Sequence, residues 1–346
     1  MAKAQAGRFR TTPGTAARMK IPFLRSRKDK AAAGEAKPAL ATTPATGEPA
    51  AAPPEQAPTA RPLAPRPRTR RVPTELVVES LGYAVAAVPS LGPTIRGWRK
   101  LGFEVSEPYA WEGCLAAHID LAGGGLRFLA PDPSQPSSPA SALVSSRFVV
   151  GSGLVGWTWA CAAPHRSALA VGQLGNHDFH AECAAEDDDV VRVPTELTPC
   201  AATWLEKPAA SPPPAHPNGV ASLDHIVLQV SAARRTAEAY EAHFGLKARS
   251  TAMNDRWYAF LKVGPSLLEI VGPQKPPAEA GTKAPSSAIT GGPWGLAFRS
   301  PDLDATVAYL RSANIQVKDP HRAVQGGRIT GMSVPLSGIP LAFLGE

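Results

Sequence analysis

The chain has 346 residues, a formal net charge of +7 and 44% hydrophobic residues, so it is long and apolar enough for two domains with sizeable cores. The charge is uneven: residues 1–71 carry 15 Lys and Arg against 4 Asp and Glu, whereas the remainder carries 21 basic and 25 acidic residues. The folded part therefore gives no electrostatic reason to expect a nucleic-acid partner. We find no apolar run of about 18 residues and no secretory signal, which predicts a cytoplasmic protein without a transmembrane segment.

Residues 1–73 contain 12 prolines and almost no aromatic residues, so they cannot bury enough apolar surface to offset their ordering entropy. The sequence predicts a disordered, basic, Ala/Pro-rich tail. A short basic stretch at 19–28 could contact an anionic membrane or a nucleic acid, but a solvated tail is the simpler interpretation. The chain has four cysteines, and no two form a C-x-x-C pair, which is typical of free thiols in a reducing compartment.

From about residue 78 the hydrophobic pattern repeats one order of elements. A strand is predicted at 81–89, a helix at 93–103, and closing strands at 114–121 and 125–131. A second and less regular repeat starts with a strand at 155–162 and runs to about residue 208.

The third repeat, 223–273, has the clearest pattern. Its first strand alternates apolar and polar residues, and its helix carries an apolar stripe from Ala233 to Phe244. Ser231 is a candidate N-terminal cap, and Gly245 is placed to end the helix. The fourth repeat has a strand at 294–298, a helix at 301–310 and final strands to residue 344. The sequence thus predicts an α+β fold of four tandem βαβββ modules.

Three segments of the third repeat resemble a module of the vicinal-oxygen-chelate superfamily, which includes glyoxalase I, bleomycin-resistance proteins and extradiol dioxygenases. They are Asp-His-Ile-Val at 224–227, His-Phe-Gly-Leu at 243–246 and Leu-Leu-Glu-Ile at 267–270. The resemblance implies that two modules pair into one domain, whose curved mixed sheet surrounds a cleft. It places glyoxalase-like domains at 78–208 and 221–346, with a proline linker at 209–220.

Superfamily enzymes usually place a His or Gln on the first strand and a Glu on the last strand of each module, and these side chains bind a divalent metal that acts as a Lewis acid. In the third module the resemblance assigns these positions to His225 and Glu269. In the fourth module they fall on Gly295 and Ala342, which offer no side-chain ligand. The corresponding positions in the first two modules are Tyr83, Arg127, Trp157 and Trp204. The N-terminal domain therefore resembles a degenerate copy, and the C-terminal domain carries half of a site.

Two interpretations of His225 and Glu269 remain open. They could share a divalent Zn, Fe, Mn, Ni or Co ion, with His321 as a candidate further ligand. Alternatively, they form a metal-free pair in which the carboxylate orients the imidazole as a general base, or simply polar residues that line an apolar cleft.

Further candidates lie around this pair. Arg256, Trp257 and Arg328 fall on or near inner strands and could shape a cleft in which an arginine binds a substrate carboxylate, although surface charge at strand ends is the simpler interpretation of the two arginines. The stretch 177–183 gathers two His, an Asp, a Glu and a Cys, which are zinc-type ligands, but a solvated loop is the competing interpretation.

The resemblance implies a lyase, isomerase or dioxygenase that acts on a small oxygenated substrate, with His225 and Glu269 as its catalytic residues. The alternative is a protein of the bleomycin-resistance type that sequesters a small molecule without catalysis. A third hypothesis is an interaction protein that acts through its basic tail. Modules of this superfamily pair within or between chains, so a homodimer is also considered. A third converging ligand would favour the metalloenzyme, and an aromatic-lined cleft without one would favour ligand binding.

Overall fold

The computed structural model describes residues 78–148, 151–175, 189–274, 289–323 and 326–346. All of them fall within one compact unit, Arg68–Glu346. The tail expected at 1–73 and the candidate ligand cluster at 177–183 lie outside the described residues. Among the described helices, none is long and apolar enough to cross a membrane.

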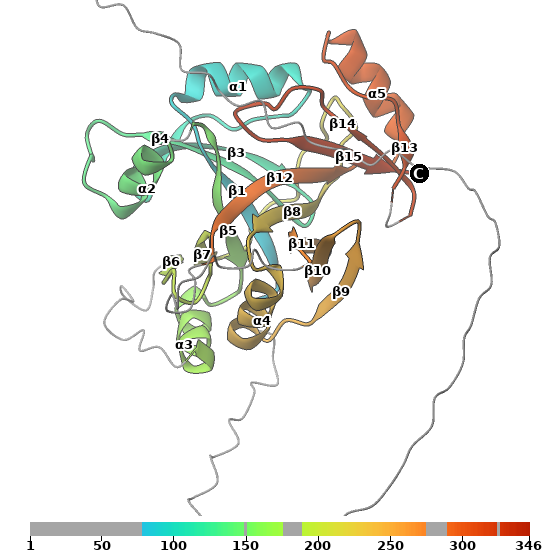
Figure 1. Ribbon diagram of the computed structural model, residues 1–346. Coiled ribbons are helices and arrows are strands. Elements are labelled where there is room, and N and C mark those ends of the chain that lie inside the picture. The colour runs from blue at the N-terminus through green and yellow to red at the C-terminus, as the bar shows by residue number, and fades with distance from the viewer. Residues whose placement is uncertain (1–77, 149–150, 176–188, 275–288, 324–325) are drawn as a thin grey trace, which may run out of the picture. The chain divides into compact units, whose positions relative to one another are not determined.

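The N-terminal sheet has seven strands in the order β2-β3-β4-β1-β5-β7-β6 (Figure 1). Its strands are β1 (Ser80–Ala87), β2 (Tyr109–Trp111), β3 (Cys114–Leu121), β4 (Gly124–Pro131), β5 (Gly153–Ala160), β6 (Val190–Val193) and β7 (Ala202–Glu206). The helices of this half are α1 (Leu91–Lys100), α2 (Pro139–Phe148) and α3 (Pro164–Gly175). β1 pairs in parallel with β4, and β5 pairs in parallel with β7. The antiparallel pair β1–β5 joins the two modules into one sheet.

The C-terminal sheet has eight strands in the order β13-β14-β15-β12-β8-β11-β10-β9 (Figure 1). Its strands are β8 (Ser222–Val230), β9 (Ala248–Met253), β10 (Arg256–Val263), β11 (Ser266–Pro273), β12 (Gly291–Arg299), β13 (His321–Arg322), β14 (Arg328–Gly331) and β15 (Leu341–Gly345). The helices are α4 (Ala233–Phe244) and α5 (Leu303–Ser312). The pattern of the N-terminal sheet recurs, because β8 pairs in parallel with β11, β12 in parallel with β15, and β8 with β12 antiparallel.

The topology confirms the predicted α+β class, with four modules paired into two curved mixed sheets. Each module begins with a strand that runs parallel to the last strand of the same module, as a crossover helix requires. The second module has one strand fewer than the others among the described residues, and α2 is a helix between modules that the sequence did not predict.

The two ends of α4 differ in how well the sequence predicted them. Gly245 ends the helix in the left-handed conformation at φ +69°, as expected. The predicted cap at Ser231 is wrong: the N-cap is Ala232, and it makes no side-chain cap hydrogen bond. The Ser231 hydroxyl instead accepts a hydrogen bond from the Thr290 backbone N–H at 3.0 Å, which ties the start of α4 to the segment before β12.

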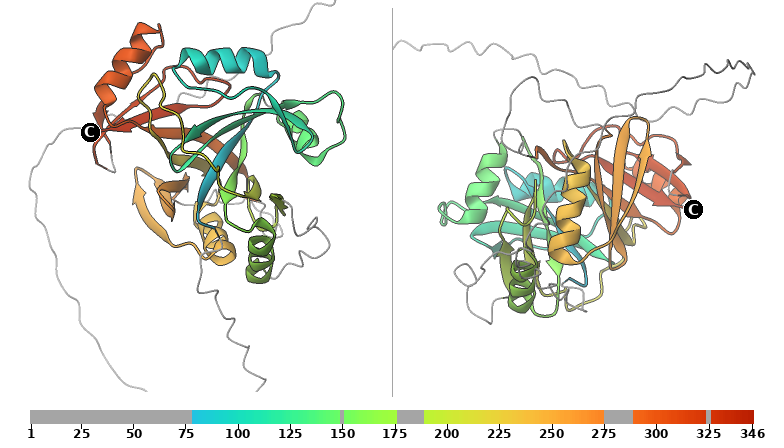
Figure 2. Two further views of the ribbon diagram at one scale, coloured as in Figure 1. Left: turned by 180° about the vertical axis from the view of Figure 1, so that it is seen from behind. Right: turned by 60° about the horizontal axis from the view of Figure 1, so that its bottom comes forward.

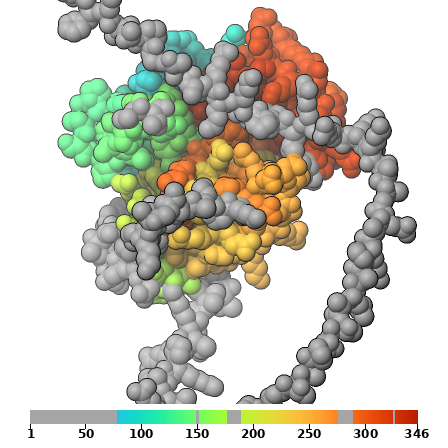
Figure 3. All heavy atoms as spheres, in the orientation of Figure 1, coloured from blue at the N-terminus to red at the C-terminus, as the bar shows by residue number. Residues whose placement is uncertain are grey.

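The two sheets share one hydrophobic core, which holds buried residues from both halves of the chain. Trp98 of α1 lies edge-on to Phe298 of β12 with ring centroids 6.3 Å apart. Trp159 of β5 packs against Phe244 of α4 at 4.7 Å. Helices α3 and α4 lie side by side (Figures 1 and 2). In the space-filling view, the N-terminal half, blue to green, contacts the C-terminal half, yellow to red (Figure 3).

The segment predicted as a linker, 209–220, ends in packed structure. Asn218 is buried, and its side-chain amide donates to the Leu101 carbonyl at 2.9 Å. The backbone carbonyl of Asn218 accepts from the Thr306 hydroxyl at 2.7 Å. His216 Nδ1 accepts from the Glu104 backbone N–H at 3.1 Å. The His-Pro-Asn-Gly turn therefore fastens residues of α5 and of the α1–β2 connection together.

Candidate functional site

The inner face of the C-terminal sheet is the face opposite α4. Side chains alternate along each strand, so Ile226, Leu228 and Ile270 are buried in the shared core while their neighbours point the other way. Several side chains on that inner face are only part-buried, among them Val227, Gln229, Tyr258, Phe260, Leu267 and Glu269. These side chains are therefore partly exposed.

A β-bulge sets the position of His225. Opposite it on β12, Ala297 pairs with His225 while the next residue, Phe298, pairs with Leu223, so Asp224 is an extra residue in β8. A bulge of this kind re-aims the side chains around it. It allows the consecutive residues Asp224 and His225 to contact each other rather than lie on opposite faces.

His225 is held through both ring nitrogens. Its Nδ1 lies 2.7 Å from Oδ1 of Asp224, and its Nε2 lies 3.2 Å from Oε2 of Glu269. The other oxygen of Asp224 accepts from Nε of Arg299 at 2.8 Å and also from a terminal nitrogen of the same guanidinium. The His225 and Asp224 side chains are each 8% exposed, and that of Glu269 is 14% exposed. The sequence prediction that His225 and Glu269 meet is matched by this geometry.

The two carboxyl groups have opposite pKa shifts. Burial is the main effect on Glu269 and raises its pKa. The charge of Asp224 also raises this pKa, and His225 lowers it, so the net shift is upward. Burial alone would also raise the pKa of Asp224, but its hydrogen bonds and charge interactions with His225 and Arg299 outweigh burial and lower it. Asp224 therefore stays ionised, whereas Glu269 retains its proton to a higher pH than an exposed Glu.

An aromatic pair stands beside Glu269. Phe260 of β10 is the direct cross-strand partner of Glu269, and Tyr258 pairs with Val271 of the same strand. The two rings are parallel, with an interplanar angle of 5° and centroids 6.4 Å apart. The inner face thus combines a polar group with an aromatic surface, as small-molecule sites do.

The donors on this face are too few for the metal site that the resemblance implies. His225 Nε2 and Glu269 Oε2 face each other, but Asp224 binds the opposite nitrogen of the ring and cannot reach an ion between them. Across the sheet the matching positions are Gly295 and Ala342. Within the described ranges no group of three His, Cys, Asp or Glu side chains could hold a metal ion. The residues that the structure describes therefore do not fit a superfamily site of three or four ligands.

The other predicted site residues lie apart from the pair. Trp257 belongs to the face of β10 that packs on the shared core, where Arg234 of α4 lies 5.7 Å from its ring. Arg256 is exposed at the start of β10. Arg328 forms a two-pronged ion pair with Asp304 of α5, and His321 is exposed on β13. Surface charge is therefore the better description of Arg328.

The inner face of the N-terminal sheet differs chemically at the same positions. In the third module Leu267 pairs with His225 and Glu269 pairs with Val227; in the first module Gly125 pairs with Tyr83 and Arg127 pairs with Val85. Tyr83 and Arg127 thus replace His225 and Glu269, as the sequence predicted. In the second module Trp204 lies on the inner face, but Trp157 is turned into the shared core, contrary to expectation.

This N-terminal face is filled by its own side chains. Arg127 and Glu206 form an ion pair at 2.8 Å, with side chains 7% and 6% exposed. The Arg127 guanidinium lies 4.2 Å from the centre of the Tyr83 ring and 4.5 Å from that of Trp111, and it donates to the Tyr109 hydroxyl at 3.0 Å. Helix α2 packs its buried residues over the apolar end of the face. The two faces therefore differ in access: the N-terminal face is occupied and the C-terminal face is partly open.

Comparison with known proteins agrees with this architecture. The family model of the Glyoxalase/Bleomycin resistance protein/Dioxygenase superfamily matches residues 222–334, which contain His225 and Glu269. Residues 222–334 therefore carry a domain of this superfamily. No curated protein sequence matches the chain.

Two solved structures show the same fold at low sequence identity. A mutant of 4-hydroxymandelate synthase from Streptomyces coelicolor is 14% identical, with a TM-score of 0.52, and the match covers 78% of this chain and 92% of that one. A fusion of a xylose isomerase-like TIM barrel with 4-hydroxyphenylpyruvate dioxygenase is 14% identical, with a TM-score of 0.55, and the match covers 82% of this chain and 51% of that one. At this identity the likeness concerns the fold.

Sequence reasoning missed Asp224, Arg299 and the pair Tyr258–Phe260. Asp224 directly precedes His225, so a signal was present, but strict alternation along a strand would have pointed it to the other face. Phe260 pairs with Glu269, so both side chains lie on the same face of the sheet. Tyr258 lies two residues before Phe260 on β10 and therefore shares that face.

Proposed function

We propose that the inner face of the C-terminal sheet binds a small oxygenated molecule, that Glu269 and His225 transfer protons to and from it, and that Asp224 orients His225. The observation that supports this most directly is the nearly buried carboxyl of Glu269, 3.2 Å from a histidine whose other nitrogen is fixed by Asp224. A buried carboxyl with a raised pKa next to an oriented imidazole is a common arrangement for general acid–base catalysis.

The roles of the three residues follow from their contacts. Ionised Asp224, neutralised by Arg299, keeps a proton on Nδ1 of His225, so Nε2 presents its lone pair toward Glu269. The imidazole can then take the proton from Glu269 and leave a carboxylate facing the inner surface. That carboxylate accepts a proton from a carbon next to a substrate carbonyl, and the pair returns the proton at a second position.

This chemistry points to an isomerase or a lyase within the superfamily. A dioxygenase needs a redox metal, and the two donors His225 and Glu269 are fewer than the three ligands that the resemblance implies for that class. Proton transfer uses only side chains of this chain.

A second candidate function is sequestration of a small aromatic molecule. It is supported by the parallel rings of Tyr258 and Phe260 and by the missing donors at Gly295 and Ala342. In this case the molecule would stack on the ring pair and hydrogen-bond to Glu269, and it would leave unchanged.

Solvent exchange separates the two functions whatever the final product is. Small carbonyl compounds (2-oxo acids, 2-hydroxy ketones and acyl thioesters) are incubated with the full-length chain in D2O, after treatment with a chelator, and loss of the proton next to the carbonyl is followed by NMR. We expect exchange with one class, and a loss of about 10²-fold or more in Glu269→Gln.

Glu238→Gln, an exposed carboxylate on α4, is the matched control and should exchange as the parent does. Equal exchange in the parent and in Glu269→Gln would contradict the proposed proton transfer. Saturable binding without exchange, weakened by Tyr258→Ala, would favour sequestration. Stoichiometric metal in the purified protein, lost in His225→Ala and in Glu269→Ala, would instead restore the metal-dependent interpretation.

A further inference from the structure

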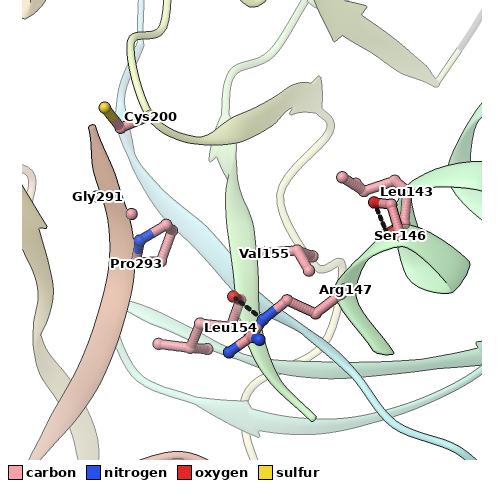
Figure 4. A pocket seen from close by; sticks show the side chains of 9 residues that line it. Leu143, Ser146, Arg147, Leu154, Val155, Cys200, Gly291 and Pro293 are labelled. Carbon is pink, nitrogen blue, oxygen red and sulfur yellow. Dashed lines mark hydrogen bonds between the residues drawn. The ribbon is translucent and has the colours of Figure 1, made fainter. Parts of the chain in front are cut away.

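A pocket of about 410 Å³ is lined by residues of both halves of the chain, and neither His225 nor Glu269 is among them (Figure 4). One wall is the last turn of α2, with Leu143, Ser146 and Arg147, and the opposite wall is the start of β12 at 291–293. Ligand pockets occur preferentially at such junctions, with volumes of about 300–1,000 Å³.

Arg147 brings a positive charge into this pocket. Its Nε donates to the Leu154 carbonyl at 3.4 Å, and the side chain extends from α2 toward Leu154 (Figure 4). Its terminal nitrogens have no hydrogen bond and no ion pair with any described residue, and the pocket lining contains no Asp or Glu. Burial lowers the pKa of Arg147, so the lost hydration of the guanidinium is not offset by an anion.

The rest of the lining is mostly apolar or lacks side chains. Leu143, Val155 and Pro293 present hydrocarbon surface, and Gly291 and Gly292 leave backbone exposed on the β12 side. A side chain at Gly292 would bring its Cβ to 3.3 Å from the Cys200 carbonyl and narrow the pocket. The pocket therefore places the terminal nitrogens of Arg147, which have no partner among the described residues, beside hydrocarbon side chains and exposed backbone.

We propose that this pocket binds a small carboxylate with an apolar body. The two oxygens of the carboxylate would bond to the terminal nitrogens of Arg147, which suit a planar, two-pronged contact. The apolar body would pack against Leu143, Val155 and Pro293. This site is separate from the proposed proton transfer, since none of Asp224, His225 and Glu269 lines the pocket.

Binding can be measured by fluorine NMR, with 4-fluorobenzoate as the probe and full-length protein. 4-Fluorobenzamide has nearly the same shape without the charge. We expect saturable binding of the benzoate, much weaker binding of the benzamide, and a loss of affinity of about tenfold or more in Arg147→Gln, because a charge-assisted contact is removed. Inorganic phosphate should compete poorly, since it cannot use the apolar walls.

Two further variants make the result specific to this pocket. Arg96→Gln removes an exposed arginine of α1 and should bind the probe as the parent does. Ser146→Trp should fill the pocket and abolish binding; Ser146 is exposed, and its hydroxyl bonds only within α2, so the fold should persist and can be checked by thermal melting. Equal binding of the two probes, undiminished affinity in Arg147→Gln, or competition by phosphate at equal concentration would each overturn the proposal.

Discussion

His225 shows how much of the candidate site depends on single side chains. Asp224 and Glu269 occupy opposite nitrogens of the same ring, so neither contact can shift without reorienting the imidazole. Asp224 in turn is bound by Arg299, whose side chain is 54% exposed. These contacts therefore connect the surface residue Arg299 to Glu269 on the inner face, and each residue in the series can be substituted on its own.

Asp224→Asn should lower the free energy of unfolding by about 1.5–3 kcal/mol at pH 7, because hydrogen bonds to a charged group are lost. The pKa of Asp224 is lowered in the folded protein, so its stabilisation is present above its unfolded value of about 3.9 and is lost as the pH falls through the folded value. Urea unfolding at pH 7 and at pH 3 should show the difference between parent and variant shrinking in acid. Asp319→Asn, which removes a 94% exposed carboxylate, is the control. A difference of equal size at both pH values would rule out this role for Asp224.

Glu269→Gln should have the opposite pH dependence. Because the pKa of Glu269 is raised by burial, the stability linked to this carboxyl is present below its unfolded value of about 4.3 and is lost as the pH rises through the folded value. Glutamine has no such loss. The variant should therefore gain stability relative to the parent between pH 4 and pH 8, as measured by urea unfolding across that range. A relative stability that is flat or falls with pH would contradict a raised pKa at Glu269.

The strands explain why the sequence predicted some of the site and not the rest. Alternation along a strand and the parallel pairing of first and last strands are local rules, and they sufficed to bring His225 beside Glu269. The bulge at Asp224 breaks alternation and has no local sequence signal. The ion pair Arg127–Glu206 joins residues 79 positions apart on two modules, and only the cross-module pairing of β1 with β5 reveals it.

The N-terminal inner face should tolerate loss of its ion pair only if both charges are removed together. Arg127→Met leaves Glu206 buried without its partner and should cost about 3–5 kcal/mol in unfolding free energy. The double variant Arg127→Met, Glu206→Leu should recover most of that loss, because two charges no longer have to be desolvated. Chemical denaturation of Arg127→Met, Glu206→Leu and the double variant measures these changes in unfolding free energy. Arg99→Met, which breaks an exposed ion pair with Glu107, should cost at most about 1 kcal/mol. A double variant no more stable than Arg127→Met would contradict the argument.

At the scale of the whole molecule, the proposed domains 78–208 and 221–346 each have a sheet of their own but do not have separate cores. Trp159 packs against Phe244, and Trp98 packs against Phe298, across the boundary between them. The sequence predicted the apolar stripe on α4 that contains Phe244. An apolar stripe predicts that one helix face is buried, but it does not identify the residues that pack against that face. The packed His-Pro-Asn-Gly turn shows the same limit: its composition indicated a linker, and its partners come from distant modules.

A shared core predicts cooperative unfolding of the two sheets. Phe244→Ala removes a fully buried ring from α4 and should cost about 3–5 kcal/mol. Five of the seven tryptophans lie in the N-terminal half: Trp98, Trp111, Trp157, Trp159 and Trp204. Tryptophan fluorescence therefore reports mainly on the half that does not contain the substitution, whereas far-ultraviolet circular dichroism reports on both.

If the core is shared, both signals shift to the same lower denaturant midpoint in Phe244→Ala, because neither sheet can lose its packing alone. Val334→Ala, at a residue 63% exposed, should leave both signals within about 0.5 kcal/mol of the parent. Fluorescence that keeps the parent's midpoint while circular dichroism acquires an earlier transition would mean that the C-terminal sheet unfolds alone. In that case the contacts of Trp159 and Trp98 join the two halves but do not couple their unfolding.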